Sequence, residues 1–276
     1  FDDDYLAMRA LDINQHHREL LERIENGVIA QYAAGRGSQQ DPLEVRGHIL
    51  ELDRERLMLE TQRRSAVAAL NRLLHRPAAA ALPPPPARLA AAPPPGARRE
   101  QPRRIAAAAR LRARRVELED ASLARYPSFE LMGSYDSMWN TWQHRWMIGI
   151  GIEIPLQRGR RDADVERARA EQARATAELA SVTDLVEEGR VRARDEVDEA
   201  ARALALYEQQ LLPTARQRVD AALAGFTAGQ APFSMAIMAE HALRDIELTI
   251  ERTRADLDRR LAALDRFEGR TPGGAR

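Results

Sequence analysis

Histidine is the residue type in this chain best able to bind a metal ion or move a proton, and there are six: His16, His17, His48, His75, His144 and His241. A metal site on a helix needs side chains three or four positions apart, so that both reach one ion. No pair of these histidines has that spacing, and the adjacent His16 and His17 point to different faces of a helix. The histidines therefore predict surface or packing roles, with no metal site.

Other residue types that carry chemistry give no site either. The chain has no cysteine, which excludes disulfides, thiolate metal sites and cysteine nucleophiles. The sequence has no glycine-rich phosphate loop, no His-Glu-x-x-His pair and no nucleophile elbow. Met235 and Met238 are three residues apart, and helix packing explains that spacing better than soft-metal binding. We expect no enzyme activity and no cofactor.

Two turns hold the residues best suited to contact another protein. The first turn carries Gly35, Arg36, Gly37, Ser38, Gln39 and Asp41, and the second carries Gly229, Gln230 and Phe233. Gly35 is a natural cap for the helix before it, while Ser38 or Asp41 can cap the next helix, with Pro42 at its first position. Capping explains part of this composition. The functional alternative is that exposed Gly, Ser and Gln form hydrogen bonds with the helix tip of a partner, and that Asp41 adds negative charge.

Long helices are expected to position these turns. Aromatic residues make up 5% of the 276, and the charged residues are balanced at 42 basic and 42 acidic. Low aromatic content with abundant Ala, Arg, Leu and Glu indicates long helices packed through small residues. The charge balance argues against nucleic acid as a partner. Apolar periodicity predicts helices over residues 5–33, 43–74, 103–124, 162–226 and 233–267, with Pro213 kinking the fourth.

Residues 128–136 and 146–155 alternate with period two instead, which predicts a β-hairpin. One face of the second strand is apolar and consists of Trp146, Ile148, Ile150, Ile152 and Ile154. Nothing else reads as sheet, so the open edges of this hairpin need a partner outside the chain. An apolar face with an aromatic girdle, here Tyr135, Trp139 and Trp142, is typical of a membrane strand. The alternative is an ordinary hairpin packed on the helices.

These patterns predict a mainly α fold with one β-hairpin. They divide the chain into a first helical hairpin (1–76), a Pro- and Ala-rich linker (77–102), a helix (103–127), the β-hairpin (128–155), a second helical hairpin (156–268) and a disordered tail (269–276). The two helical hairpins read as an internal repeat. Residues 31–35 superpose without gaps on residues 225–229, and Leu43 then meets Ile237.

The order of several motifs resembles that of TolC-like outer-membrane efflux proteins, in particular those paired with heavy-metal pumps of the resistance-nodulation-division type. The motifs are Tyr-Ala-Ala-Gly at 32–35, Tyr-Pro at 126–127, Gly-Ile-Gly at 149–151, Leu-Leu-Pro at 211–213 and Phe-Thr-Ala-Gly at 226–229. The resemblance implies a homotrimer with coiled-coil-like helices. In it, the helices form a hollow periplasmic α-barrel, and strand hairpins form a transmembrane β-barrel in the outer membrane of a Gram-negative bacterium.

The same resemblance implies a passive exit duct that opens at its helical tips. An inner-membrane pump would deliver substrates, metal ions among them, through a periplasmic adaptor protein that touches the two turns, and the isoleucine face would meet the lipid bilayer. The family has two strand hairpins per subunit and this chain shows one, so we expect the amino end to be missing. The competing hypothesis is a periplasmic coiled-coil adaptor or scaffold with no channel, whose hairpin packs on its helices.

Overall fold

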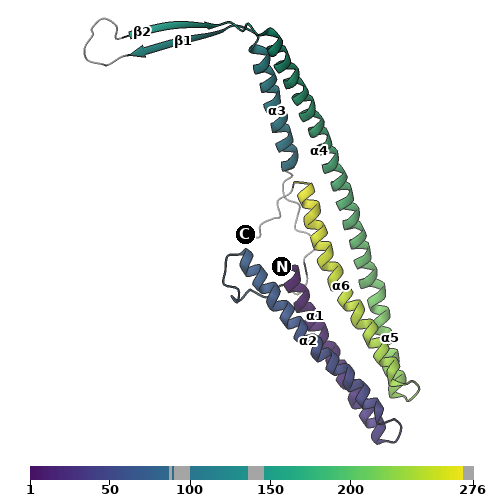
Figure 1. Ribbon diagram of the computed structural model, residues 1–276. Helices are drawn as coiled ribbons and strands as arrows, with labels where there is room; N and C mark the ends of the chain where they lie inside the picture. Colours follow the sequence, from purple (N-terminus) through teal and green to yellow (C-terminus); the bar gives the residue numbers. More distant parts are fainter. Residues whose placement is uncertain (87–88, 90–99, 136–145, 270–276) are drawn as a thin grey trace. The chain divides into compact units, whose positions relative to one another are not determined.

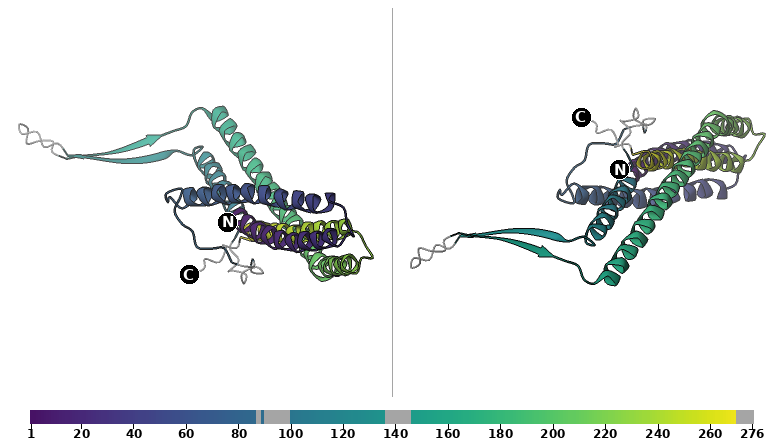
Figure 2. Two further views of the ribbon diagram at one scale, coloured as in Figure 1. Left: turned by 90° about the horizontal axis from the view of Figure 1, so that it is seen from below. Right: turned by 90° about the horizontal axis from the view of Figure 1, so that it is seen from above.

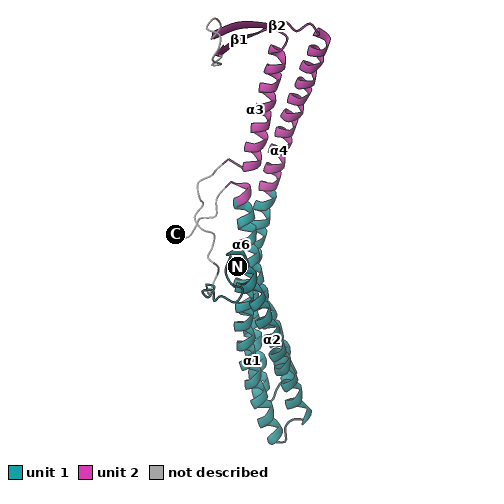
Figure 3. Ribbon diagram, turned by 60° about the vertical axis from the view of Figure 1, so that its left-hand side comes forward, with its two compact units in different colours: residues 1–96, 192–265, 272–276 teal, residues 97–191, 266–271 magenta. Residues whose placement is uncertain are grey.

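A computed structural model describes residues 1–86, 89, 100–135 and 146–269 of the chain (Figure 1). Its elements are α1 (Asp2–Ala33), α2 (Gln40–Leu73), α3 (Pro102–Leu123), β1 (Ser128–Tyr135), β2 (Trp146–Glu153), α4 (Arg158–Leu206), the π-helical turn η1 (Tyr207–Leu211), α5 (Leu212–Thr227) and α6 (Phe233–Phe267). They divide into unit 1, which comprises residues 1–96, 192–265 and 272–276, and unit 2, which comprises residues 97–191 and 266–271 (Figure 3). Within the described residues, no helix is both long enough and apolar enough to cross a membrane.

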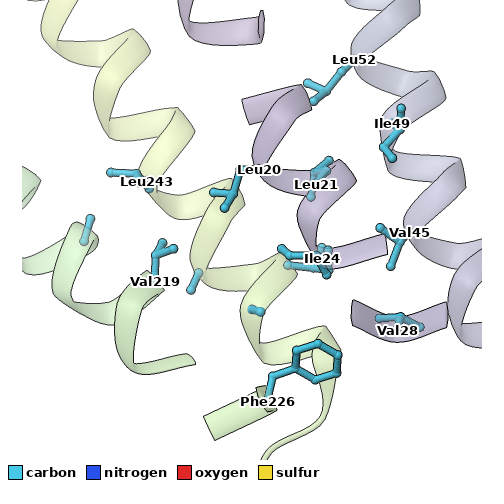
Figure 4. Packing of buried hydrophobic residues seen from close by; sticks show 14 residues of the cluster. Leu20, Leu21, Ile24, Val28, Val45, Ile49, Leu52, Val219, Phe226 and Leu243 are labelled. Carbon is cyan, nitrogen blue, oxygen red and sulfur yellow. The ribbon is translucent and has the colours of Figure 1, made fainter. Parts of the chain in front are cut away.

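The core of unit 1 lies between four helices. Buried side chains from α1, α2, α5 and α6 form one apolar cluster, in which the aliphatic residues of α1 and α2 interlock and Phe226 closes the end near the turns. Figure 4 shows the helices that meet there in the order α5, α6, α1, α2, with α5 and α2 on the outer sides. The two middle helices are therefore covered on two sides, and the outer helices on one.

Most helix boundaries agree with the expected ones, and the positions of the two prolines Pro42 and Pro213 have a physical explanation. Helix α2 begins at Gln40 rather than at residue 43, so Pro42 falls in its first turn, where a missing N–H costs no hydrogen bond. Pro213 follows the π-helical turn η1 and sits at the start of α5. A π turn shifts the hydrogen-bond ladder by one residue, so the chain continues as helix past the proline, as the kinked-helix prediction requires.

The first residues of the linker are tied to the end of α2. Asn71 is buried, and its amide Nδ2 donates to the carbonyl oxygens of Ala78 at 3.1 Å and Ala80 at 2.8 Å. Arg76 donates to the carbonyl oxygen of Ala81 at 3.0 Å. One buried side chain thus satisfies two backbone acceptors of the linker, which has no helix or strand of its own to pair them.

We expect Asn71→Ala to release this segment. Losing both hydrogen bonds inside a buried site should lower the free energy of unfolding by about 1–3 kcal/mol. It should also speed proteolysis between residues 76 and 82. Leu73→Ala is the matched control, because Leu73 is exposed near the same helix end and such a change stays within about 0.5 kcal/mol. Urea unfolding and limited proteolysis measure the two effects, and equal behaviour of both variants would contradict the role of Asn71.

Unit 2 presents the strand pair. The strands β1 and β2 leave the neighbouring ends of α3 and α4 as a two-stranded antiparallel ribbon (Figures 1 and 2). An ion pair links the two helices, with Arg110 Nη1 at 2.6 Å from Glu178 Oε1. A second joins Arg125, two residues past the end of α3, to α4, with Arg125 Nη2 at 2.7 Å from Asp162 Oδ1. Both pairs are largely exposed, so each contributes little to stability.

Candidate functional site

The strand pair has two faces of opposite character. In the β1–β2 register, Phe129 lies opposite Ile152, Leu131 opposite Ile150 and Gly133 opposite Ile148. Residues directly opposite each other in an antiparallel pair share a face, so the isoleucines and their partners form one continuous apolar face. The other face pairs Ser128 with Glu153, Glu130 with Gly151, Met132 with Gly149 and Ser134 with Met147. We call it the small polar face after its serines, glycines and glutamates, although it also carries two methionines.

The apolar face is uncovered. Ile148 and Ile150 expose 79% and 75% of their surface, and every residue of β1 is exposed. Monomeric soluble proteins rarely leave a contiguous apolar strand face in water. The competing hypothesis of a hairpin packed on its own helices requires this face to be buried, and it is not.

An aromatic contact closes the described end of the ribbon. The ring centres of Tyr135 and Trp146 are 4.6 Å apart and tilted by 45°, a separation at which aromatic pairs attract. Trp139 and Trp142, the other members of the expected girdle, lie outside the described residues. Ile154 lies one residue past the end of β2 and is exposed.

The two turns are built from the same hydrogen bonds. At the first, Gly35 N–H donates to Tyr32 O at 2.9 Å and Arg36 N–H to Gln31 O at 2.9 Å. At the second, Gly229 N–H donates to Phe226 O at 3.0 Å and Gln230 N–H to Gly225 O at 2.9 Å. Gly35 and Gly229 have φ of 71° and 70°, the left-handed conformation that ends a helix in this way. Each residue of the second turn is 194 positions after its counterpart, which is the offset of the internal repeat.

The residues expected to meet a partner differ in exposure. The first turn is exposed from Gly35 to Gln40, and in the second Gly229 and Gln230 are exposed. Asp41 is half-buried, and its Oδ2 accepts from Ser38 N–H at 2.9 Å. Phe233 is partly buried and packs against the core of unit 1. Asp41 therefore stabilises the first turn, and Phe233 anchors the second to the core. The exposed residues of both turns remain available for contact.

We expect Gly35→Ala to lower the free energy of unfolding by about 1–2 kcal/mol, because a left-handed φ places Cβ against the following carbonyl. Gly47→Ala is the control with the opposite sign. A Cβ at Gly47 meets no atom within 4 Å, and alanine in a helix interior is favoured over glycine by about 0.5–1 kcal/mol. Urea unfolding of the two variants should show midpoints that move in opposite directions. Two shifts of the same sign would contradict the assigned role of Gly35.

A buried polar seam joins α1 to α6, and sequence reasoning missed it. His17 and Glu240 expose 0% of their side chains, and His17 Nδ1 lies 2.7 Å from Glu240 Oε1. His17 Nε2 lies 3.0 Å from Glu247 Oε2. Further along, Tyr5 donates its hydroxyl proton to Glu251 Oε2 at 2.6 Å. We call these five residues the α1–α6 seam.

The contacts of the seam favour the charged form of His17. Two carboxylates face the two ring nitrogens, and only an imidazolium donates from both. Burial alone would lower the pKa of His17, but hydrogen bonds and charge from Glu240 and Glu247 outweigh it, so the pKa is raised. Burial would likewise raise the pKa of Glu247, and His17 with Arg216 reverses this, so that pKa is lowered. Both shifts favour the ionised forms of His17 and Glu247.

One sequence signal could have exposed the seam. His17 falls in the same helical phase as Ile13, Leu20 and Ile24, all of which are buried. A charged residue in an apolar phase predicts a buried partner. The sequence does not say which carboxylate supplies it, because Glu240 is 223 positions away.

The described residues contain no group of three or more metal-ligating side chains arranged to hold an ion. Their chemistry consists of helix-to-helix polar contacts, exposed turns and an uncovered apolar strand face. That combination defines a class of protein in which helices support an exposed strand pair with one apolar face.

Comparison with protein families matches residues 96–270 to the family described as outer membrane efflux protein. The chain therefore belongs to the outer membrane efflux protein family, and its expected localisation in the outer membrane is confirmed. The comparison with curated proteins gives no match.

Several solved structures share this fold. A membrane protein from Pseudomonas aeruginosa is 21% identical with a TM-score of 0.78, and the alignment covers 97% of this chain and 66% of that one. The outer-membrane channel OprN is 20% identical with a TM-score of 0.78, over 97% and 64%. The outer membrane protein VceC from Vibrio cholerae is 16% identical with a TM-score of 0.78, over 98% and 68%. At these identities the likeness concerns the fold, and the chain spans about two thirds of each relative.

The comparisons confirm the predicted mainly α fold of long helices with one β-hairpin. The narrower prediction, a partner of heavy-metal pumps, stays a prediction, because these matches are likenesses of fold and name no substrate.

Proposed function

We propose that this chain is the outer-membrane channel component of a tripartite efflux system. It acts as a passive exit duct through which substrates, metal ions among them, leave after an inner-membrane pump has delivered them through a periplasmic adaptor. The single observation that carries this proposal is the two-faced ribbon. Its apolar face suits lipid, and its small polar face suits a water-filled lumen, which is the alternation of a transmembrane barrel strand.

Three copies of the chain form the duct in this proposal. Each outer edge of the β1–β2 pair has unpaired backbone groups, and lipid cannot satisfy them. Strands of neighbouring subunits supply the missing hydrogen bonds when the sheet closes into a barrel, because closure removes all edges. The long helices form the periplasmic part of the duct in this proposal.

The exposed residues of the two turns are the contact for the adaptor. Gly35 to Gln39 and Gly229 with Gln230 are exposed, and they bring glycines and polar side chains to a helix end whose backbone is fixed by hydrogen bonds. Such a surface allows close approach of another helix tip and hydrogen bonding to its backbone. Asp41 and Phe233 hold the turns in shape in this arrangement, and their contribution to the adaptor contact is indirect.

The test is purification of the full chain followed by light scattering in detergent and conductance in planar bilayers. We expect the chain in the membrane fraction, a homotrimer in detergent, and discrete conductance steps after reconstitution. Recovery as a soluble monomer that leaves bilayers sealed would overturn the channel and favour the scaffold.

A further inference from the structure

Three arginines lie where the strand pair joins the helices. Arg158, Arg160 and Arg161 follow the end of β2 and stand in the first turn of α4. Arg158 and Arg160 are exposed, and Arg161 is half-buried. Within the part of the chain that the structure describes, no ion pair or side-chain hydrogen bond holds any of these three guanidinium groups. We call Arg158, Arg160 and Arg161 the arginine patch.

The other connection of the strand pair lies beside the arginine patch. Arg125 precedes β1, and its ion pair with Asp162 at 2.7 Å holds this connection against the start of α4. Tyr126 follows Arg125 and exposes 69% of its surface. Leu156 lies between β2 and the arginine patch and exposes 87%. The base of the strand pair therefore combines free positive charge with an exposed aromatic ring and an exposed aliphatic side chain.

The length of the strands places this base at the edge of a bilayer, if the strand pair spans one as proposed above. Strand β1 has eight residues, which span about 26 Å. At a tilt of about 40° they cover about 20 Å of a membrane whose apolar band is about 25 Å high. Residues just outside the strands, such as Tyr126 and Leu156, then fall at the edge of that band, and the arginine patch falls in the headgroup layer.

The stability of α4 does not explain the arginine patch. Cations are unfavourable in the first turn of a helix, because the helix dipole is positive there, and this turn has no acidic residue. Asp162 is already paired with Arg125, and no ion pair joins the nearby Asp164 to the patch. A negatively charged group from outside the chain would compensate this charge. A phosphate suits it best, because the planar guanidinium group forms paired hydrogen bonds with phosphate oxygens.

We propose that the arginine patch binds the headgroup phosphate of an anionic phospholipid, for which phosphatidylglycerol is the test ligand. The acyl chains of the lipid run along Leu156 and the isoleucine face of β2, and the ring of Tyr126 lies at the level of the headgroup. The net charge of the lipid matters, because a zwitterionic headgroup carries its own cation beside the phosphate and competes with the arginines. This inference rests on the proposed membrane strand pair and adds the class of lipid that it contacts.

Competition between two lipids in one sample tests the proposal. The full chain in neutral detergent is mixed with equal amounts of phosphatidylglycerol and phosphatidylcholine of different acyl mass, and native mass spectrometry measures which lipid each assembly retains. We expect the chain to retain phosphatidylglycerol at least about tenfold more than phosphatidylcholine, because each arginine near an anionic lipid favours binding about fivefold. The double variant Arg158→Gln with Arg160→Gln should lower this ratio at least about fivefold.

The double variant Arg112→Gln with Arg174→Gln is the matched control. Both residues are exposed arginines without a side-chain contact in the described part of unit 2. Arg174 lies 16 residues after Arg158, or about 24 Å further along α4, and Arg112 lies near the same level, since its neighbour Arg114 is 3.9 Å from Glu171. The control removes the same charge away from the strands, so it should retain the preference of the unaltered chain within about twofold.

Two further measurements give each outcome one meaning. An excess of soluble glycerol phosphate should leave the bound phosphatidylglycerol in place, and its displacement would show a site for free phosphate and overturn the lipid assignment. The same spectra give the mass of the assembly. A trimer with no preference for phosphatidylglycerol, or with a preference that both double variants lose equally, overturns the arginine patch and leaves the proposed function standing. A monomer that retains neither lipid overturns both.

Discussion

Replacing His17 with alanine is expected to lower the free energy of unfolding of unit 1 by about 3–5 kcal/mol. That is the usual cost of removing one partner of a buried ion pair, because the other charge stays buried without compensation. Here the carboxylate left behind is Glu240, which is fully buried, and its Oε2 already has no hydrogen-bond partner. Urea unfolding followed by circular dichroism measures the change.

Two further variants separate the ion pair from simple packing. His16→Ala is the matched control, because His16 is the neighbouring residue and is exposed, so its effect should stay within about 0.5 kcal/mol. The double variant His17→Leu with Glu240→Met removes the two fully buried ionisable groups at similar volume and leaves Glu247 paired with Arg216. Such replacements are often neutral. Recovery of most of the stability by the double variant supports the charge argument. If the double variant is as unstable as His17→Ala, packing rather than charge explains the loss.

The same seam makes stability depend on pH in a defined direction. The pKa of His17 is raised in the folded state, so its contribution is complete below the unfolded value of about 6.5 and is lost as the pH rises through the folded pKa. The pKa of Glu247 is lowered, so its contribution is present above about 4.3 and is lost as the pH falls through its folded pKa. His17→Ala should abolish the decline on the alkaline side, and His16→Ala should keep it. Unfolding midpoints across the pH range test this.

Sequence periodicity predicts a structural feature well when that feature depends on a single helix, strand or turn. The isoleucine face of β2 follows from alternation alone, and the register adds Phe129 and Leu131 of β1 to it. The glycine-ended turns follow in the same way, since only local backbone conformation is involved. Both features depend only on residues close together in the sequence, so a local sequence pattern is enough to predict them.

The α1–α6 seam could not be predicted in this way, because it joins residues that are far apart in the sequence. Exposed ion pairs contribute little to stability, so helices joined only by them can slide past each other at modest cost. The ion pairs of unit 2 are of this largely exposed kind. In unit 1 the contact between α1 and α6 instead includes the buried imidazole ring of His17 between the carboxyl groups of Glu240 and Glu247. Such a pair breaks at high cost. Opening at the turns therefore requires motion that keeps α1 with α6, which favours the outer helices α2 and α5 as the moving surfaces of the proposed duct.

The other large expected effect concerns the membrane. Ile150→Arg should remove the chain from the outer-membrane fraction, because arginine at the middle of a lipid-facing strand costs about 2–4 kcal/mol per subunit. Ile150 lies at the centre of the apolar face, opposite Leu131, and three copies would multiply the cost. Fractionation of cells that express the variant, with immunoblotting of membrane and soluble pools, measures the distribution.

Met132→Arg is the matched control, because it places the same charge on the opposite face of the strand pair. Met132 follows Leu131 on β1 and belongs to the small polar face, opposite Gly149. The two variants place the same charge at neighbouring positions of the strand pair, because Met132 is next to the residue that pairs with Ile150. A general effect of charge on folding or export would therefore act on both. In the proposed barrel Met132 faces the water-filled lumen, where arginine remains hydrated, so this variant should stay in the membrane. Equal loss of both variants, or normal insertion of Ile150→Arg, would mean that the isoleucine face does not meet lipid.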